Sequence, residues 1–275
     1  MTHVSLEELT DGELHVSHSQ ISTYQLCSLK YYFHYVEARK AESVSAALPF
    51  GASLHSAIAV YYRSVKHGKT EPLNNIIDCF NTAFTLDMES SDVPILFSKN
   101  MPDKEAALKM AKSMLEVFYT NNNLNGFEVV DVELPLSSPL YTVDGGTTDY
   151  RIIGIIDLLL KSPDGELLIV DNKSASKSLS QQMAEQDHQM TAYSYLLATN
   201  RYISPASTVQ CRFDVLLKLK SPKIQNIQTS RTRSDRRRFA RLSNMVLSGI
   251  DSNIFIPNPS WMCPTCQYAQ ACSEW

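Results

Sequence analysis

Two aspartates and a lysine flank a short turn in the segment GIIDLLLKSPDGELLIVDNK, residues 154–173. Asp157 precedes the turn, and Asp171 and Lys173 follow it. A three-residue hairpin loop commonly combines a type I turn with a last residue in the left-handed region, and Gly165 suits that last position. In this register Asp157 faces Asp171 directly, and Lys173 shares their face of the sheet. A loop of another length would shift the register by one residue and separate the two carboxylates.

These three side chains suit metal-assisted chemistry on a phosphate. The flanking stretches are apolar on both faces, so the strands are expected to be buried, where two opposed carboxylates repel each other unless a cation lies between them. Oxygen ligands at a partly open site favour Mg²⁺ or Mn²⁺. A nearby lysine can stabilise charge that develops on a phosphate, or help to position and activate water. The alternative is that these are strand-end charges that face solvent.

The segment resembles the core of the PD-(D/E)xK nuclease superfamily, and especially its RecB-like and Cas4-like iron–sulfur exonuclease branch. Asp157 matches the first acidic ligand in a G-x-x-D setting, and residues 171–173 match the (D/E)-x-K element. The family's proline before the first aspartate is absent, as is usual in this branch. The resemblance implies a restriction-endonuclease-like α/β fold and a metal-dependent DNA nuclease. Asp157 and Asp171 would hold Mg²⁺ or Mn²⁺, and Lys173 would assist catalysis.

Other positions agree with this resemblance. A G-x-x-x-H pattern ends at His55, which the resemblance makes a metal ligand, although a lone histidine on a helix is often a core residue. Gln189 and Tyr193, four residues apart, share a helix face and would orient the lysine and contact the DNA backbone. Their alternative is buried packing on the sheet. Glu133 corresponds to an additional acidic catalytic residue of the family, and Asp131 is a rival because it has the same strand parity.

The cysteines predict a metal site that joins the two ends of the chain. Three closely spaced cysteines need a fourth ligand, and a four-cysteine site holds either zinc or an iron–sulfur cluster. In the resembled branch one cysteine precedes the catalytic core and three follow it, which implies a [4Fe–4S] cluster; the spacing alone leaves zinc open. The predicted ligands are Cys27, Cys263, Cys266 and Cys272, whereas Cys79 and Cys211 are expected to be core thiols.

Six arginines crowd a short helical stretch near the C-terminus. Guanidinium groups bind phosphate in a bidentate manner, so this stretch could contact the DNA backbone without reading bases. The alternative is a solvated helix face. The residues are Arg231, Arg233, Arg236, Arg237, Arg238 and Arg241.

The elements that would position these groups follow from hydrophobic periodicity. Helical spacing predicts helices over 17–36, 49–67, 180–199 and 231–249, and two more within 71–121. Apolar and alternating runs predict strands over 127–134, 150–161, 166–172 and 208–220. We expect one domain over 1–275 with a mixed central sheet flanked by helices. It would carry a helical insertion over 71–125 and a cysteine loop over 257–275, which the four cysteines join to the first helix.

Composition restricts the function and the surroundings of the protein. The 275 residues are 44% hydrophobic and 20% charged, with a net charge of −4, so a DNA contact requires a local basic patch. No apolar run is long enough to cross a membrane, and the N-terminus has no apolar segment typical of a signal peptide. A cytoplasmic location is therefore expected, where cysteine clusters bind metals more often than they form disulfides.

Three functions compete at this stage. The first is an exonuclease that acts on single-stranded DNA ends; since the sequence has no P-loop, a helicase or another DNA-processing protein would have to unwind the duplex. The second is a non-catalytic DNA-binding or assembly module that retains the nuclease fold. The third is a zinc-stapled scaffold. Cleavage polarity, pathway and oligomeric state do not follow from the sequence.

Overall fold

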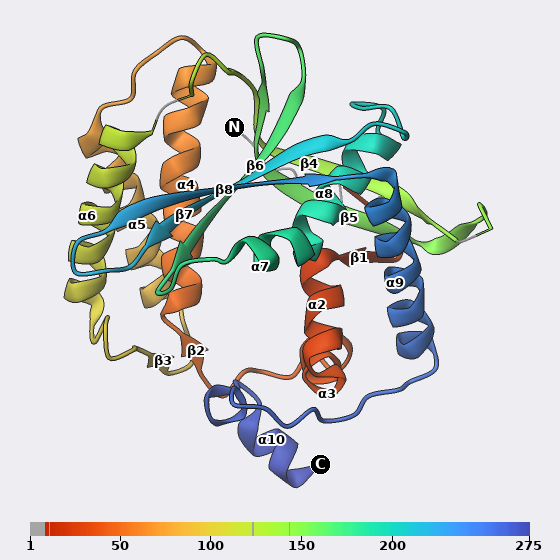
Figure 1. Ribbon diagram of the computed structural model, residues 1–275. Coiled ribbons are helices and arrows are strands. Elements are labelled where there is room, and N and C mark those ends of the chain that lie inside the picture. The colour runs from red at the N-terminus through yellow and green to blue at the C-terminus, as the bar shows by residue number, and fades with distance from the viewer. Residues whose placement is uncertain (1–8, 11, 123, 143) are drawn as a thin grey trace.

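A twisted mixed sheet forms the centre of the computed structural model, which describes residues 9–10, 12–122, 124–142 and 144–275 (Figure 1). The long strand β5 (Thr147–Lys161) pairs along one edge with antiparallel β4 (Glu128–Tyr141). Its other edge pairs first with parallel β1 (His15–Ser17) and then with antiparallel β6 (Leu167–Ala175). The sheet continues through parallel β7 (Val209–Leu217) to antiparallel β8 (Lys223–Arg231).

Two groups of helices cover this sheet, on opposite sides in Figure 1. One group holds α4 (Ala47–Lys66), α5 (Leu73–Glu89) and α6 (Lys104–Asn121). The other holds α2 (His18–Leu26), α8 (His188–Thr199) and α9 (Arg233–Asp251), with the short α7 (Gln181–Gln186) before α8. A separate small sheet pairs β2 (Val44–Ser45) with β3 (Ile95–Leu96). None of the helices in the described part of the chain is long and apolar enough to span a membrane.

Strand alternation divides the hydrophobic core between these two groups. On β6, Ile169 packs into the cluster that contains α8 and α9, while Leu168 and Val170 pack into the cluster that contains α4, α5 and α6. Since successive side chains of a strand point to opposite faces, Asp171 and Lys173 continue the face of Ile169. The catalytic candidates of β6 therefore lie on the α8 side of the sheet.

The predicted fold class, a restriction-endonuclease-like α/β fold with a mixed sheet flanked by helices, is confirmed. Several element predictions need correction. The helix expected over 17–36 is interrupted at Cys27, whose extended backbone separates α2 from α3 (Ser28–Tyr31) and the π-helical turn η1 (Tyr32–Val36). The helix expected over 180–199 breaks at Asp187, which caps α8. Strand β8 was not predicted, because its sequence KIQNIQTSR is polar and carries no apolar run.

The C-terminal part of the chain runs beneath α2 and α3, the first helices after β1 (Figure 1). Extended residues after α9 run along the first helices, where Tyr24 and Ser28 donate hydrogen bonds to the carbonyls of Ile254 and Ile256. The sequence predicts only a loop for the tail. The structure instead contains a 3₁₀ turn (Cys263–Thr265) and the helix α10 (Ala269–Glu274) there. The expectation about the extreme N-terminus concerns residues 1–8, which lie outside the described residues.

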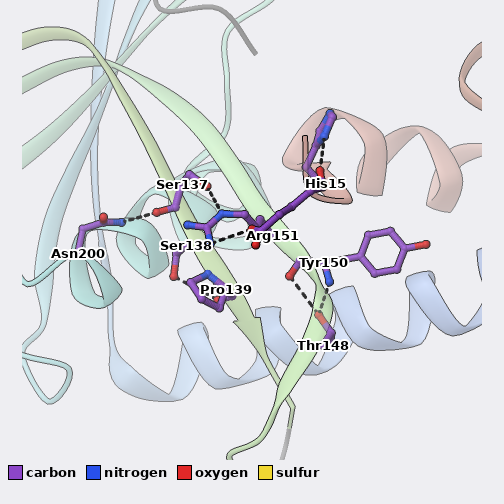
Figure 2. A network of polar contacts seen from close by, with 9 residues as sticks. His15, Ser137, Ser138, Pro139, Thr148, Tyr150, Arg151 and Asn200 are labelled. Atoms are coloured by element: carbon purple, nitrogen blue, oxygen red, sulfur yellow. Dashed lines mark hydrogen bonds and ion pairs between the residues drawn. The ribbon is translucent and has the colours of Figure 1, made fainter. Parts of the chain in front are cut away.

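Beyond the part of β5 that pairs with β6, strands β4 and β5 continue as a long arm, and β1 pairs with the free edge of β5 there. Figure 2 shows how this arm is held. Arg151 Nε donates to Ser137 Oγ at 2.7 Å, which ties the two strands together, and Asn200 Nδ2 at the end of α8 donates to the carbonyl of Ser137 at 3.1 Å. Arg151 also forms an ion pair with Glu13 next to β1. The arm is thus attached both to β1 and to α8.

Candidate active site

The β5–β6 hairpin brings Asp157 and Asp171 opposite each other. Its turn has the expected three-residue geometry: the amide of Gly165 donates to the carbonyl of Ser162, and Gly165 has a φ of +89°, in the left-handed region. The register pairs Leu158 with Val170, so one further step along both strands pairs the two aspartates. The register predicted from the sequence is therefore the one observed.

Asp157 is held by β6 and by helix α4. One of its oxygens, Oδ2, accepts the backbone amide of Asn172 at 2.8 Å and lies 3.2 Å from Nδ1 of His55. Burial acts to lower the pKa of His55, but the hydrogen bond and charge of Asp157, with the charge of Asp171, outweigh it, and the pKa is raised. Helix α4 therefore delivers an imidazole to the first aspartate, as the G-x-x-x-H pattern predicts.

Asp171, Lys173 and Gln189 form a closed polar network on the α8 side of the sheet. Lys173 Nζ lies 2.9 Å from Asp171 Oδ2 and donates to Gln189 Oε1 at 2.8 Å. The amide nitrogen of Gln189 donates to Asp171 Oδ1 at 2.7 Å and to the hydroxyl of Tyr193 at 2.9 Å. The i, i+4 spacing of Gln189 and Tyr193 thus places both on the face of α8 that covers the aspartates.

Burial dominates the electrostatics of this network. Asp171 is 1% exposed, and burial raises the pKa of its carboxyl to about 7, with Lys173 opposing the shift and Asp157 adding to it. Burial acts to lower the pKa of Lys173, but the adjacent Asp171 carboxylate reverses this effect and the pKa is raised. Burial and the charges of Asp171 and Asp157 hold the pKa of Tyr193 far above its usual range, so its hydroxyl stays protonated.

Gly154 explains the glycine of the G-x-x-D pattern. A Cβ atom at this position would stand 2.9 Å from Leu196 Cδ1 and 3.3 Å from Tyr193 Cε1. Helix α8 therefore lies so close to β5 that any residue other than glycine at position 154 would force Leu196 or Tyr193 to move. Because Tyr193 anchors Gln189, this close approach also sets where the network meets the two aspartates.

Glu133 reaches the neighbourhood of the site but turns toward α4. It lies between Val132 and Leu134, which pair with Leu158 and Ile156, so the register sets it opposite Asp157. Its backbone has a φ of +51°, in the left-handed region, and its carboxylate forms an ion pair with Arg63. The rival Asp131 forms an ion pair with Lys66. Neither acid forms a hydrogen bond or ion pair with Asp157 or Asp171 among the described residues.

The donor set suits a hard divalent cation. Two carboxylates face each other at a buried strand end with an imidazole beside them, and Asp171 Oδ2 meets no hydrogen-bond donor at a suitable angle among the described residues. The side chains are paired with one another, His55 with Asp157 and Lys173 with Asp171. Accordingly, no set of three histidine, cysteine or acidic side chains stands at metal-binding spacing anywhere in the described ranges.

The four predicted cluster cysteines lie where the C-terminal tail meets the first helices, but among the described residues they do not stand at metal-binding spacing. Burial, followed by the nearby thiols of Cys27, Cys266 and Cys263, raises the pKa of Cys272. The amide of Ser260 donates to Cys263 Sγ at 3.2 Å. The break at Cys27 lets α3 pack against the tail, where Tyr268 is buried. The residue types fit the chemistry of a four-cysteine site, but their side chains are not gathered into one here.

The arginine stretch divides into two groups that the sequence did not distinguish. Arg231 and Arg236 are 2% and 4% exposed and cannot contact a DNA strand, which corrects their assignment. Arg231 ends β8 and donates to the carbonyls of Ala184 and Asp187 before α8, and Arg236 donates to the carbonyls of Pro205 and Ser207. The exposed members are Arg233, Arg237, Arg238 and Arg241.

Two contributors to these surfaces were not expected from the sequence. Asn172, the middle residue of the D-x-K element, supplies the backbone amide that Asp157 accepts. Arg201, just beyond α8, is exposed on the same side as the exposed arginines of α9, with which it lines one hollow. No sequence pattern marks a single arginine in a loop, so only the packing of α8 against α9 reveals it.

Comparison with known proteins points in the same direction as this geometry. A family model described as the PD-(D/E)XK nuclease superfamily matches residues 15–273. No curated protein matches the chain. The crystal structure of a Eubacterium rectale protein provisionally named an exonuclease is similar, with 12% identity and a TM-score of 0.56, over 98% of this chain and 94% of that chain. The crystal structure of a protein named SSO0001 aligns over 92% of this chain and 94% of that chain, with 13% identity and a TM-score of 0.35.

Proposed function

Because the chain belongs to the PD-(D/E)XK nuclease superfamily, we propose that it is a metal-dependent deoxyribonuclease that degrades single-stranded DNA from its ends. The observation that carries this proposal is the meeting of Asp157 and Asp171 across the hairpin, with Lys173 Nζ 2.9 Å from Asp171 and His55 3.2 Å from Asp157. A structural role would leave two opposed carboxylates, one buried and one half-buried, without a reason, since their mutual repulsion opposes folding.

His55, Asp157 and Asp171 would hold Mg²⁺ or Mn²⁺. When bound, such an ion supplies a Lewis acid for the phosphoryl oxygens and lowers the pKa of an attacking water. The ammonium of Lys173 faces the same carboxylates and would stabilise the negative charge that develops on the phosphate. Gln189 holds Lys173 and Asp171 in a fixed relation, because one amide group contacts both.

Tyr193 would contribute a proton donor at the edge of the site. Its hydroxyl accepts from Gln189 and stays protonated, so its own proton is available for a phosphate oxygen of the bound strand. Glu133 is proposed to act as an additional acidic residue, reaching the site by exchange of its partner Arg63. Membership of the RecB-like and Cas4-like branch belongs to the same proposal, and a separate protein would unwind the duplex because the sequence has no P-loop.

We also propose that Cys27, Cys263, Cys266 and Cys272 hold a [4Fe–4S] cluster that fastens the two ends of the chain. The C-x2-C-x5-C spacing of the last three cysteines supports this proposal, and zinc is the alternative. The absorption of anaerobically purified protein at about 400 nm, with its iron and sulfide content, distinguishes them. A colourless protein that contains zinc and no iron would establish the zinc-stapled form.

Degradation of a labelled DNA strand tests the enzymatic proposal. Wild type with Mn²⁺ should shorten a linear single strand and leave a circular one intact, and a matched RNA strand tests the choice of DNA. Lys173→Ala should reduce the rate by at least about 10²-fold, the usual contribution of a positioned charged group. Lys109→Ala, an exposed residue of α6 without an ion pair among the described residues, is the matched control.

The opposite outcome is equally informative. If wild type cleaves no strand with any divalent cation but still binds DNA, the protein is a non-catalytic module that retains the nuclease fold. If circular DNA is cut as fast as linear DNA, the requirement for an end is wrong while the nuclease itself stands.

A further inference from the structure

A basic hollow lies at the end of α8, away from the two aspartates. It has a volume of about 870 Å³ and is bounded by the end of α8, the first turns of α9 and the start of the β4–β5 arm tip at Tyr141. None of the described residues that line it is acidic. We call it the arginine basin. Its exposed guanidinium groups belong to Arg201, Arg233, Arg237, Arg238 and Arg241.

These five arginines are not neutralised within the protein. No hydrogen bond or ion pair of their side chains occurs among the described residues, in contrast to the buried Arg231 and Arg236. The acid nearest in sequence, Asp235, is occupied as part of the capping box of α9, where it accepts from the amide and hydroxyl of Thr232. Several exposed like charges without counter-charges repel one another, so the basin is suited to an anionic partner.

The walls of the basin are fixed before any partner arrives. Tyr195 on α8 donates to the carbonyl of Pro139 and accepts the amide of Tyr141, so the arm is bound to α8. Asn244 on α9 donates to the carbonyl of Tyr141, and Asn200 donates to the carbonyl of Ser137, as Figure 2 shows for the latter. Preorganised walls lower the entropic cost of binding.

Arg201 occupies a position whose backbone favours glycine. It follows the C-cap Asn200 of α8 and has a φ of +64°, in the left-handed region where a side chain is strained. A residue that costs stability at a helix end, yet directs its charge to the same hollow as four other arginines, indicates a function for the guanidinium.

The basin is within reach of a strand bound at the active site. Gln189 and Thr199 lie at opposite ends of α8, roughly 15 Å apart at 1.5 Å per residue, or about four nucleotides at duplex spacing.

We propose that the arginine basin binds the backbone phosphates of the DNA strand a few nucleotides away from the bond that is cleaved. This inference rests on the proposed nuclease function and extends it to the substrate-holding surface. Guanidinium groups recognise phosphates and not base edges here, so the contact is independent of sequence. The basin gives an overall acidic protein its local attraction for a polyanion.

Binding of a fluorescent oligothymidylate of about 20 nucleotides, followed by anisotropy in EDTA over a series of salt concentrations, tests the proposal without cleavage. Arg237→Ala/Arg241→Ala should weaken binding roughly 20-fold at 0.1 M salt and reduce the single-strand salt slope by about 1.4, the value for two lost phosphate contacts. The matched control, Lys109→Ala/Lys112→Ala on α6, removes the same charge elsewhere and should bind like wild type.

Glycine adopts the left-handed backbone of position 201 without strain, so Arg201→Gly should fold normally. Weaker binding by this variant could then not be attributed to misfolding. The variant should weaken binding roughly fivefold, the single-strand value for one contact, while the melting temperature stays the same or rises. Unchanged salt slopes in both basin variants, or equal losses in the α6 control, would overturn the proposal. Because the assay contains no divalent cation, its result is independent of whether the protein cleaves DNA.

Discussion

At the scale of single residues, the site contains more negative than positive charge. Asp157 and Asp171 face one ammonium, that of Lys173, and His55 adds a positive charge only when it is protonated. Such an excess in a buried position is costly, and a divalent cation between the carboxylates would relieve it. The same residues that destabilise the bare fold are thus the ones that would bind the metal.

A substitution of Gln189 tests whether catalysis depends on the residue that holds Asp171 and Lys173 in place. Gln189→Leu keeps the size of the side chain but removes both the acceptor for Lys173 and the donor for Asp171. We expect kcat on single-stranded DNA to fall by about 10–100-fold, as for other residues that orient ligands, with little change in KM. Gln182→Leu on the exposed face of α7 is the control, and equal activity of both variants would contradict the role of Gln189.

The lowered pKa of His18 leads us to expect a loss of stability in mild acid. Burial lowers its pKa to about 4, with Asp187 opposing and Lys173 adding to the shift. Its unfolded pKa is about 6.5, so the unfolded chain takes up a proton first, and the free energy of unfolding falls as the pH decreases from about 6.5 toward 4. His18→Gln should flatten this dependence in chemical denaturation at a series of pH values.

The raised pKa of Asp171 contributes with the opposite sign over part of this range, because its stabilisation is present at low pH and is lost as the pH rises to about 7. Asp171 is present in both proteins, so the difference between wild type and His18→Gln isolates the histidine. Parallel pH profiles for the two proteins would show that His18 has the same pKa in the folded and unfolded states, which would contradict the prediction.

At the scale of elements, the approach of α8 to β5 positions half of the site. Helix α8 begins at Asp187, whose side chain accepts the amide of Met190, and its first turn carries Gln189. Arg231 at the end of β8 binds the carbonyl of Asp187, which fixes the start of the helix against the sheet. The break between α7 and α8 is therefore part of the construction of the site.

A matched pair of glycine substitutions separates close packing from helix propensity. Gly154→Ala would force Leu196 or Tyr193 to move, so we expect a loss of about 1–3 kcal/mol in the free energy of unfolding and lower activity. Gly51→Ala meets only Ser174 Oγ, at 4.0 Å, inside α4, and should stabilise the protein by about 0.5–1 kcal/mol. Equal stability of the two variants in thermal and chemical unfolding would disprove this explanation of the glycine at 154.

At the scale of the whole molecule, the tail closes the fold on itself. Glu42 accepts the amides of Gln270 and Ala271 at the start of α10, and His34 contacts the hydroxyl of Tyr268 at 2.7 Å. The four proposed cluster cysteines belong to the segments that meet at this junction. A cross-link here would enclose nearly the whole described sheet and restrict the unfolded chain over a very long loop.

Loss of one cysteine should therefore affect the entire domain. We expect Cys27→Ser to lose its metal and to reduce the free energy of unfolding by about 4–5 kcal/mol, the loop-closure value for a long loop. Cys79 lies on α5, outside the junction, so Cys79→Ser should keep the metal and the wild-type free energy of unfolding. Metal content and denaturant unfolding measure these effects, and a Cys27→Ser protein as stable as Cys79→Ser would argue against a staple.

The sequence by itself determined the features that depend on local geometry. A three-residue turn and the two-residue period of strands set the register of Asp157, Asp171 and Lys173, and helical spacing placed Gln189 and Tyr193 on one face. The mixed sheet between helices followed from the change of hydrophobic period along the chain. Each of these depends on residues close together in sequence, where few conformations compete.

Tertiary structure alone decided the features that depend on burial and on distant partners. Arg231 and Arg233 look equivalent in sequence, yet one ends a strand beneath α8 and the other faces solvent. Glu133 shares the register of Asp157 but turns to Arg63, and Arg201 joins α9 only because α8 packs beside it. The reason is physical: charge and hydrogen-bonding capacity belong to a residue type, but burial is set by whichever elements pack against it.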